Sequence, residues 1–251
     1  MRRTLACFIA FIASVLLAAG LCFAEQPAGP GQAEHVTGTI DGRSVDSEKK
    51  VTYHCIIQPE TDHDFVLIAF EGSRMDPRQK GNGVIWTEGL DRFDVVDFSI
   101  ADELCAWQKK KWENVCNLYS AAVVDVLREQ FGDVKTVGIY AFSKGASAAD
   151  CVCRTLRESG INVAFVWLND AFTTHGLPYV TELTENGEIL LYNRYSKDER
   201  VNQLSKKLHK NCSDLPNVDS RHIRSSHGGL IKYGSFPDEL ADAVMKASFV
   251  R

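Results

Sequence analysis

Val137-Gly-Ile-Tyr-Ala-Phe-Ser143-Lys-Gly-Ala146 is the stretch of sequence that decides the fold. Its first half is apolar and partly β-branched, which predicts a buried strand, and its end leads into an Ala-rich segment that predicts a helix. Ser143 lies at the junction, with Ala141 two residues before it and Gly145 two residues after it. Small residues at these places allow a strand and a helix to pass closely. The stretch therefore predicts a strand, a sharp turn that exposes a serine, and a helix.

The same alternation of strands and helices continues on both sides of this stretch. Apolar runs predict strands, and apolar residues at three- and four-residue spacing predict helices. The predicted strands span 35–40, 51–57, 65–70, 93–100, 136–141, 163–168, 189–193 and 220–224, and the predicted helices span 112–131, 144–158, 199–209 and 236–249. The first two strands are expected to form a hairpin. The pattern indicates one α/β domain with a mostly parallel central sheet and helices on both faces.

Three polar residues follow predicted strands in the chain order serine, acid, histidine. Ser143, Asp198 and His227 each lie within a few residues of a strand end. Ligands of open α/β sheets bind beyond the carboxyl ends of the strands, so the three side chains are expected at one edge of the sheet. There His227 would take the proton of Ser143 as the hydroxyl attacks a carbonyl, while Asp198 would fix the imidazole tautomer.

The turn around Ser143 resembles the nucleophile elbow of the α/β-hydrolase family, G-x-S-x-G, with Ala141 in place of the first glycine. The order of serine, acid and histidine is also that of the family. The resemblance extends over about 35–249 and implies a single α/β-hydrolase-like domain. It implies little or no lid, because the connection over 169–188 is short. It also implies cleavage of carboxylic esters or thioesters through an acyl-enzyme on Ser143.

Other residues compete for the same roles. Asp170, after the strand over 163–168, is the alternative acid, and Glu199 is a more distant one. His222 is the alternative histidine. Aspartates in loops often cap turns or helices, so a local capping role is the competing interpretation of Asp198.

The resemblance also implies an oxyanion hole made of two backbone N–H groups. One belongs to the residue after the nucleophile, which is Lys144. The other lies in the loop Phe70-Glu71-Gly72-Ser73 and is carried over to Ser73. Many family members have His-Gly in this loop, whereas this chain has Glu71-Gly72. A carboxylate there would oppose a developing oxyanion unless a nearby cation offset it.

The N-terminal segment predicts export. Arg2-Arg3 precede an apolar run over 5–19, and Ala24 precedes the polar Glu25-Gln26. A charged start, a short apolar middle and a small final residue are typical of a secretory signal peptide, here cleaved near Ala24. The run is at or below the ~20 residues that cross a bilayer, so no stable membrane span is expected. The mature protein is expected to be secreted or periplasmic.

Three segments follow from these patterns. Residues 1–24 are assigned to the signal peptide, residues 25–34 to a flexible leader that contains Pro27 and Pro30, and residues 35–251 to the α/β domain. No internal repeat or further linker is present, so the length is accounted for by one domain.

The sequence contains 8 cysteines, of which Cys7 and Cys22 lie in the predicted signal. The remaining cysteines are Cys55, Cys105, Cys116, Cys151, Cys153 and Cys212. An even number in an exported protein predicts disulfides; sequence does not fix the pairing, and Cys105 with Cys116 is the first candidate pair. Buried free thiols are the alternative. The single residue between Cys151 and Cys153 does not match the spacing of zinc ligands, so no metal is expected.

Composition narrows the function classes. The chain has 251 residues, a net charge of −5 and a pI of about 5.8, with no basic block, which argues against a nucleic-acid partner. The sequence predicts an exported serine hydrolase that acts on a small-molecule or acyl-ester substrate without a cofactor. An inactive α/β-hydrolase-like binding protein, or an amidase, peptidase or acyltransferase on the same scaffold, is the alternative. The substrate-binding residues and the oligomeric state remain open.

Overall fold

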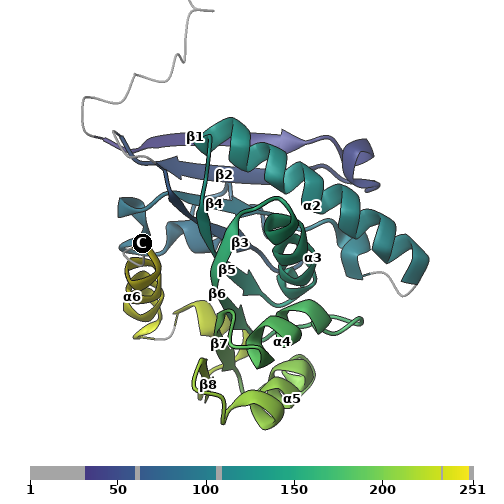
Figure 1. Cartoon of the computed structure of the whole chain (residues 1–251), viewed down its shortest axis with the longest axis vertical. Coiled ribbons are helices and arrows are strands. Elements are labelled where there is room, and N and C mark those ends of the chain that lie inside the picture. The colour runs from purple at the N-terminus through teal and green to yellow at the C-terminus, as the bar shows by residue number, and fades with distance from the viewer. Residues whose placement is uncertain (1–31, 60–62, 106–108, 233, 249–251) are drawn as a thin grey trace, which may run out of the picture. The chain divides into compact units, whose positions relative to one another are not determined.

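An eight-stranded sheet organises the molecule, with the strand order β1-β2-β4-β3-β5-β6-β7-β8. Figure 1 shows the computed structural model, which describes residues 32–59, 63–105, 109–232 and 234–248. The strands β1 and β2 form an antiparallel hairpin, and β2 pairs with β4 antiparallel. All other neighbouring strands in the sheet pair in parallel. The predicted α/β domain with a mostly parallel sheet is therefore confirmed.

The elements have the following bounds. The strands are β1 (Glu34–Ile40), β2 (Val51–Ile57), β3 (Phe65–Phe70), β4 (Val95–Phe98), β5 (Thr136–Phe142), β6 (Asn162–Asn169), β7 (Leu190–Tyr195) and β8 (Val218–His222). The helices are α2 (Lys109–Phe131), α3 (Gly145–Glu158), α4 (Pro178–Glu185), α5 (Gln203–Cys212) and α6 (Phe236–Ser248). Short 3-10 helices are η1 (Gly42–Val45), η2 (Val84–Trp86), η3 (Leu90–Arg92), η4 (Asp102–Cys105) and η5 (His227–Lys232).

Every predicted strand and helix has a counterpart, with ends shifted by a few residues, but the prediction missed α4. This helix occupies the connection over 169–188 and begins with Pro178 in its first turn. Its apolar stripe consists of Val180 and Leu183, both buried. Two buried aliphatic residues in an eight-residue helix are too few for a helical period to be recognised in the sequence.

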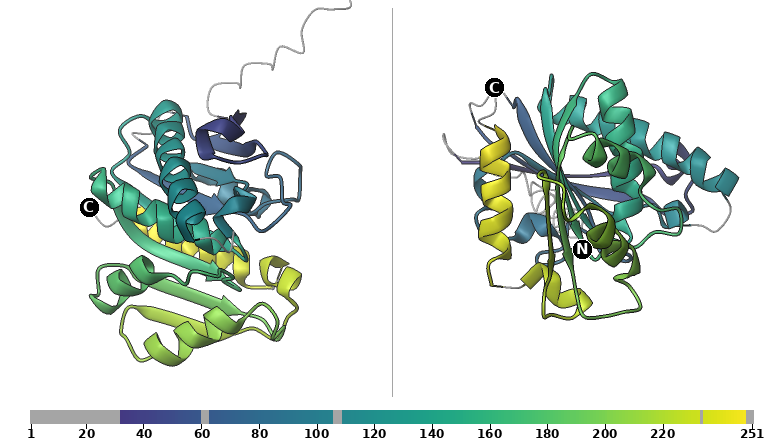
Figure 2. Two further views of the ribbon diagram at one scale, coloured as in Figure 1. Left: turned by 90° about the vertical axis from the view of Figure 1, so that its right-hand side faces the viewer. Right: turned by 60° about the horizontal axis from the view of Figure 1, so that its bottom comes forward.

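Two apolar layers hold the helices against the sheet. Side chains alternate between the two faces of each strand, so Val66 and Ile68 of β3 pack in one layer and Leu67 in the other. The first layer contains α2, α3, α4 and α5, and the second contains α6. Figure 2 shows α6 on one side of the sheet and α2 and α3 on the opposite side. The expectation of helices on both faces is confirmed.

A disulfide joins Cys116 of α2 to Cys151 of α3, with the Cα atoms 5.6 Å apart. The candidate pair Cys105–Cys116 was therefore wrong. The two helices pack side by side on one face of the sheet, which brings together cysteines far apart in the sequence. Cys55, Cys153 and Cys212 are buried free thiols, as the alternative interpretation held.

The predicted signal peptide and most of the leader lie outside the described residues, and β1 begins at Glu34. Within the described part of the chain, no helix combines the length and apolar character needed to span a membrane.

Candidate active site

Ser143 lies in a strained turn between β5 and α3. Its backbone φ is 53°, in the left-handed region that non-glycine residues rarely adopt. The Ser143 N–H donates to the Asn169 carbonyl at 2.9 Å, and its carbonyl accepts from the Phe172 N–H at 2.9 Å. Backbone strain of this kind is concentrated at functional sites, where the surrounding structure holds it. The end of β6 thus fixes the turn that carries Ser143.

The small residues around Ser143 have structural reasons. A Cβ on Gly145 would lie 2.2 Å from the Phe70 carbonyl oxygen, so no larger residue fits where α3 passes the end of β3. Ala141 is fully buried, and its strand neighbours are Phe70 of β3 and Leu168 of β6. Glycine is therefore required two residues after the serine, whereas alanine suffices two residues before it.

His227 and Asp170 form a hydrogen-bonded pair at the same edge of the sheet. His227 Nδ1 lies 2.9 Å from Asp170 Oδ2. Asp170 is 0% exposed, and its other oxygen, Oδ1, accepts the Ser196 N–H at 2.7 Å. The His227 ring stacks on Phe142, with ring centroids 4.7 Å apart and an interplanar angle of 24°. Since Phe142 directly precedes Ser143, this stack holds the imidazole beside the strained turn.

Asp198, the acid predicted from the sequence, is not hydrogen-bonded to His227 among the described residues. Its carboxylate pairs with Arg200, with Arg200 Nη2 3.1 Å from Oδ2, and this guanidinium lowers the pKa of Asp198. Asp198 also closes a local turn, because its carbonyl accepts the Val201 N–H. Asp170 follows β6 immediately, whereas Asp198 lies beyond the end of β7 in a turn that bonds within itself. The acid that bonds His227 is therefore Asp170.

The other alternative residues lie elsewhere. Glu199 pairs with Lys206 on the surface, at 3.2 Å. His222, at the end of β8, is exposed and stacks on Tyr195 with centroids 5.3 Å apart. Neither is brought to the strained turn at Ser143 by a described contact.

The loop after β3 lies against the residue that precedes the serine. A Cβ on Gly72 would come 3.0 Å from the Phe142 ring, and the next residue, Ser73, is half-buried. Glu71 turns inward and is 0% exposed. Its Oε1 accepts the Val84 N–H at 2.5 Å, and burial raises the pKa of its carboxyl. The predicted conflict between a Glu71 carboxylate and an oxyanion is thereby reduced, because the carboxyl is directed into the protein.

Lys144 precedes the first turn of α3. The Ser143 and Lys144 carbonyls accept the N–H groups of Ala146 and Ser147, so a hydrogen-bonded turn leads from the serine into α3. A helix N-terminus carries partial positive charge and directs N–H groups outward. This end of α3 is suited to stabilise negative charge that develops at Ser143.

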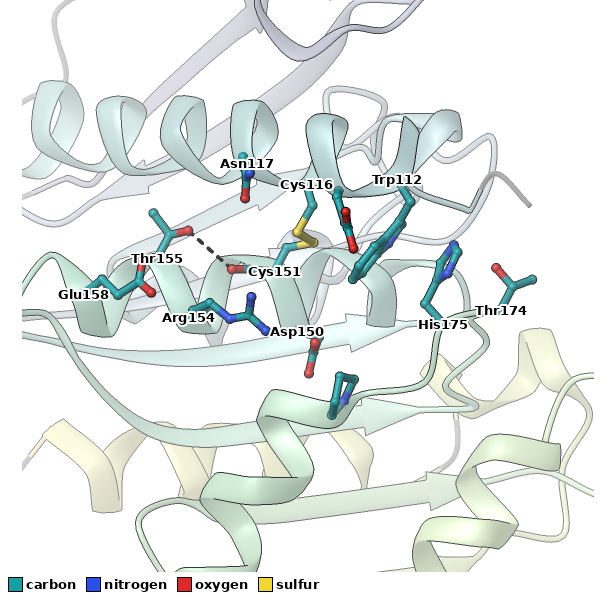
Figure 3. A pocket seen from close by; sticks show the side chains of 12 residues that line it. Trp112, Cys116, Asn117, Asp150, Cys151, Arg154, Thr155, Glu158, Thr174 and His175 are labelled. Atoms are coloured by element: carbon teal, nitrogen blue, oxygen red, sulfur yellow. Dashed lines mark hydrogen bonds between the residues drawn. A yellow bond between two sulfur atoms is a disulfide. The ribbon is translucent and has the colours of Figure 1, made fainter. Parts of the chain in front are cut away.

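A cleft of about 760 Å³ opens between α2, α3 and the chain after Asp170. Figure 3 shows Trp112 and His175 facing each other at one end and the disulfide along one wall. The two rings stack with centroids 4.5 Å apart. The chain that supplies His175 also supplies Phe172, which bonds the Ser143 carbonyl. No sequence pattern indicated this cleft, because its walls come from segments that only the fold brings together.

Asp150 is a buried acid in the wall of the cleft. It is 2% exposed, and its Oδ1 accepts the N–H groups of Tyr179 and Val180, each at 2.9 Å. Burial raises the pKa of Asp150 to about 6. Because the two donors open α4, Asp150 fixes the start of that helix against α3. Among the residues that the structure describes, no three His, Cys, Asp or Glu side chains are grouped to hold a metal ion.

No family model matches the chain, and no curated protein matches it in sequence. Solved structures match it in fold. An S-formylglutathione hydrolase from Agrobacterium tumefaciens has a TM-score of 0.55 and 12% identity, over 88% of this chain and 98% of that one. A hyperthermophilic esterase from the archaeon Pyrobaculum calidifontis has a TM-score of 0.52 and 9% identity, over 86% and 84%. An α/β-hydrolase enzyme from the metagenome of Lake Arreo, Spain, has a TM-score of 0.51 and 10% identity, over 94% of both chains.

Proposed function

We propose that this chain, which has the α/β-hydrolase fold, is a serine hydrolase that cleaves carboxylic ester or thioester bonds through an acyl-enzyme on Ser143. One observation carries the proposal: a serine with positive φ at a strand-to-helix turn directly follows Phe142, whose ring stacks on a histidine that is hydrogen-bonded to a fully buried aspartate. The named activities of the structural neighbours, hydrolase and esterase, agree with this reaction class.

The contacts support the following roles. Asp170 accepts a hydrogen bond from His227 Nδ1, which leaves Nε2 of the ring as the base for Ser143. His227 takes the proton as Ser143 attacks the carbonyl, then returns it to the leaving alcohol or thiol. Water, activated by the same imidazole, hydrolyses the acyl-enzyme. In this proposal Asp170 replaces Asp198 as the acid.

The oxyanion of the tetrahedral intermediate would be held by backbone N–H groups. The Lys144 N–H, at the start of α3, is one proposed donor, and the Ser73 N–H is the other. The contact between Gly72 and Phe142 supports this pairing, because it keeps the loop after β3 next to the turn at Ser143. Such donors lower the barrier most when they are fixed before the reaction begins.

Export is part of the proposal. A disulfide between α2 and α3 fits an oxidising compartment, which agrees with a signal peptide over 1–24. Mass spectrometry of the protein secreted or exported by its host would then give Glu25 as the first residue. A mature protein that retained Met1 would contradict this assignment.

Steady-state hydrolysis of p-nitrophenyl acetate and of a matched thioester tests the reaction. The wild-type protein should turn over both, and Ser143→Ala should lose at least ~10³-fold in kcat. Turnover by Ser143→Ala at the wild-type rate would exclude Ser143 as the nucleophile. A folded wild-type protein with no turnover of any ester, thioester or amide would favour the binding-protein alternative.

A further inference from the structure

Glu71 and Asp97 form a buried pair of carboxyl groups directly behind the loop after β3. Glu71 is the first residue after β3, and Asp97 lies on the adjacent strand β4, opposite Ala69 in the register. Both are 0% exposed. Among the described residues, no lysine, arginine or histidine forms an ion pair with either carboxyl group.

One oxygen of each carboxyl holds the start of η2. Glu71 Oε1 accepts the Val84 N–H at 2.5 Å, and Asp97 Oδ2 accepts the Ile85 N–H at 3.1 Å. Gly83 packs so closely on the pair that a Cβ there would lie 2.6 Å from Asp97 Oδ2. Together the two carboxyls attach the segment at 83–85 to the ends of β3 and β4.

The other oxygen of each carboxyl group lacks a hydrogen-bond donor among the described residues. Glu71 Oε2 and Asp97 Oδ1 are buried, and neither accepts a hydrogen bond from any N–H or O–H donor of the described residues. The two carboxyl groups contact each other, and burial together with this contact raises the pKa of Asp97 well above its usual range. A hydrogen bond between two carboxyl groups requires that one of them is protonated and donates to the other.

We propose that Glu71 and Asp97 share a proton and thereby position the backbone at Gly72–Ser73 as one side of the oxyanion hole. Glu71 is a positioning residue in this proposal, because it acts through the loop and does not touch the substrate. The shared proton removes one of two negative charges from behind the site, and the bonds to Val84 and Ile85 prevent the loop from moving away from Phe142. The inference rests on the proposed serine-hydrolase function.

Three other titratable groups lie near Asp97. His54 lies opposite Asp97 on β2, bonds the Pro77 carbonyl, and has its pKa lowered by burial. Burial raises the pKa of the Cys55 thiol to about 12, and it raises that of Tyr119, whose hydroxyl donates to the Ser99 carbonyl. All three are neutral near pH 7, so the proton held by the carboxyl pair decides the charge at this place.

The test compares Glu71→Gln with Glu71→Ala in ester hydrolysis. The glutamine can still accept from Val84 and donate to Asp97, so kcat should stay within ~3-fold of the wild type. The alanine removes the hydrogen-bond partner of both the Val84 N–H and the Asp97 carboxyl. We expect kcat to fall at least ~10-fold while KM stays within ~3-fold of the wild type, because the oxyanion hole acts in the transition state. Thr184→Val, a buried hydroxyl of α4 remote from the loop, is the matched control and should leave both constants unchanged.

Two results separate this inference from the proposed function. Failure of a fluorophosphonate to label Ser143 in folded wild-type protein would refute the function itself. Labelling at Ser143 together with a folded Glu71→Ala variant that keeps kcat within ~3-fold would overturn only the positioning role.

The pH profile of kcat decides the case if Glu71→Ala does not fold. Loss of the shared proton should lower the wild-type kcat reversibly at alkaline pH, and Glu71→Gln should lack this decline. Tyr119→Phe should keep the decline, which assigns it to the carboxyl pair. Identical alkaline profiles in the wild type and Glu71→Gln would overturn the inference.

Discussion

Ser143 and Asp170 share a rare backbone conformation, with φ values of 53° and 44°. Such conformations cost roughly 1–3 kcal/mol each and persist only where the surrounding structure enforces them. Ser143 directly follows β5 and Asp170 directly follows β6, and the backbone bond from Ser143 to Asn169 joins the two turns. The sheet therefore fixes both side chains before a substrate arrives.

Gly145→Ala tests the tight turn. The new Cβ would meet the Phe70 carbonyl oxygen at 2.2 Å, and this backbone atom cannot move without displacing β3. We expect a loss of at least ~2 kcal/mol in the free energy of unfolding, together with loss of esterase activity. Urea denaturation measures the first effect. Gly234→Ala, where a Cβ meets nothing within 4 Å, is the control and should be nearly neutral; equal stability of the two variants would contradict the close approach.

Asp170→Asn and Asp198→Asn distinguish the two acids. The hydrogen bond from His227 goes to Asp170, so its replacement by asparagine should lower kcat by ~10³-fold or more. Asp198 pairs with the exposed Arg200, and its replacement should change kcat by less than ~5-fold. Stopped assays with p-nitrophenyl acetate give both values. The opposite order would return the role of the acid to Asp198.

The sequence predicted Ser143, Asp198 and His227 as the site residues, with Asp170 as the alternative acid, and in the structure His227 is hydrogen-bonded to Asp170. Ser143 lies between small residues at fixed spacing, and His227 follows the last strand. Asp170 and Asp198 both follow buried strands, and the sequence does not show that Asp170 reaches His227 while Asp198 closes its own turn. That choice depends on how β6 and β7 end in space.

The helices α2 and α3 are held together by the bond between Cys116 and Cys151, which are 35 residues apart in the sequence. The double variant Cys116→Ala/Cys151→Ala should lose about 2–4 kcal/mol in the free energy of unfolding, because the unfolded chain is no longer cross-linked. Denaturation with and without reductant measures this loss. Cys153→Ala, which removes a free thiol, should keep the response to reductant. A free energy of unfolding of the wild-type protein that is the same with and without reductant would contradict the assigned pairing.

The start of α4 should make stability depend on pH through Asp150. Its pKa is raised to about 6 in the folded protein, so the folded state binds this proton more tightly than the unfolded state. The stabilisation is fully present below the unfolded pKa of about 4 and is lost as the pH rises through 6. Asp150→Asn keeps an acceptor for Tyr179 and Val180 and removes the charge.

Chemical denaturation at pH 4 and pH 7.5 measures this dependence. The free energy of unfolding of Asp150→Asn, relative to that of the wild type, should be higher at pH 7.5 than at pH 4 by roughly 2–3 kcal/mol. A difference between variant and wild type that is the same at both pH values would show that Asp150 does not titrate in this range.

Helices and strands with a strong apolar periodicity could be predicted from the sequence, whereas a short helix and a pairing between distant residues could not. The long helix that became α2 and the buried strand that became β3 follow from apolar spacing alone. The helix α4 has only a short apolar stripe, and the partner of Cys116 depends on which helix packs against α2. Local sequence contains neither piece of information.

The whole molecule follows the predicted architecture: one mostly parallel sheet with helices on both faces. Parallel strands covered on both sides must be apolar throughout, which is why their sequence signal is strong. The buried carboxyl pair of Glu71 and Asp97 had no such signal, because a glutamate after a strand usually faces solvent. Export remains a prediction for residues outside the described part of the chain.

Covalent labelling of Ser143 tests the central claim most directly. The purified, folded protein is treated with a fluorophosphonate probe and digested, and the adduct is mapped by mass spectrometry, with Ser143→Ala and Asp170→Asn treated in parallel. We predict one adduct on Ser143 in the wild type, none in Ser143→Ala, and much slower labelling in Asp170→Asn. Two results would contradict the account: no labelling of Ser143 in the wild-type protein, or labelling of Asp170→Asn as fast as that of the wild type.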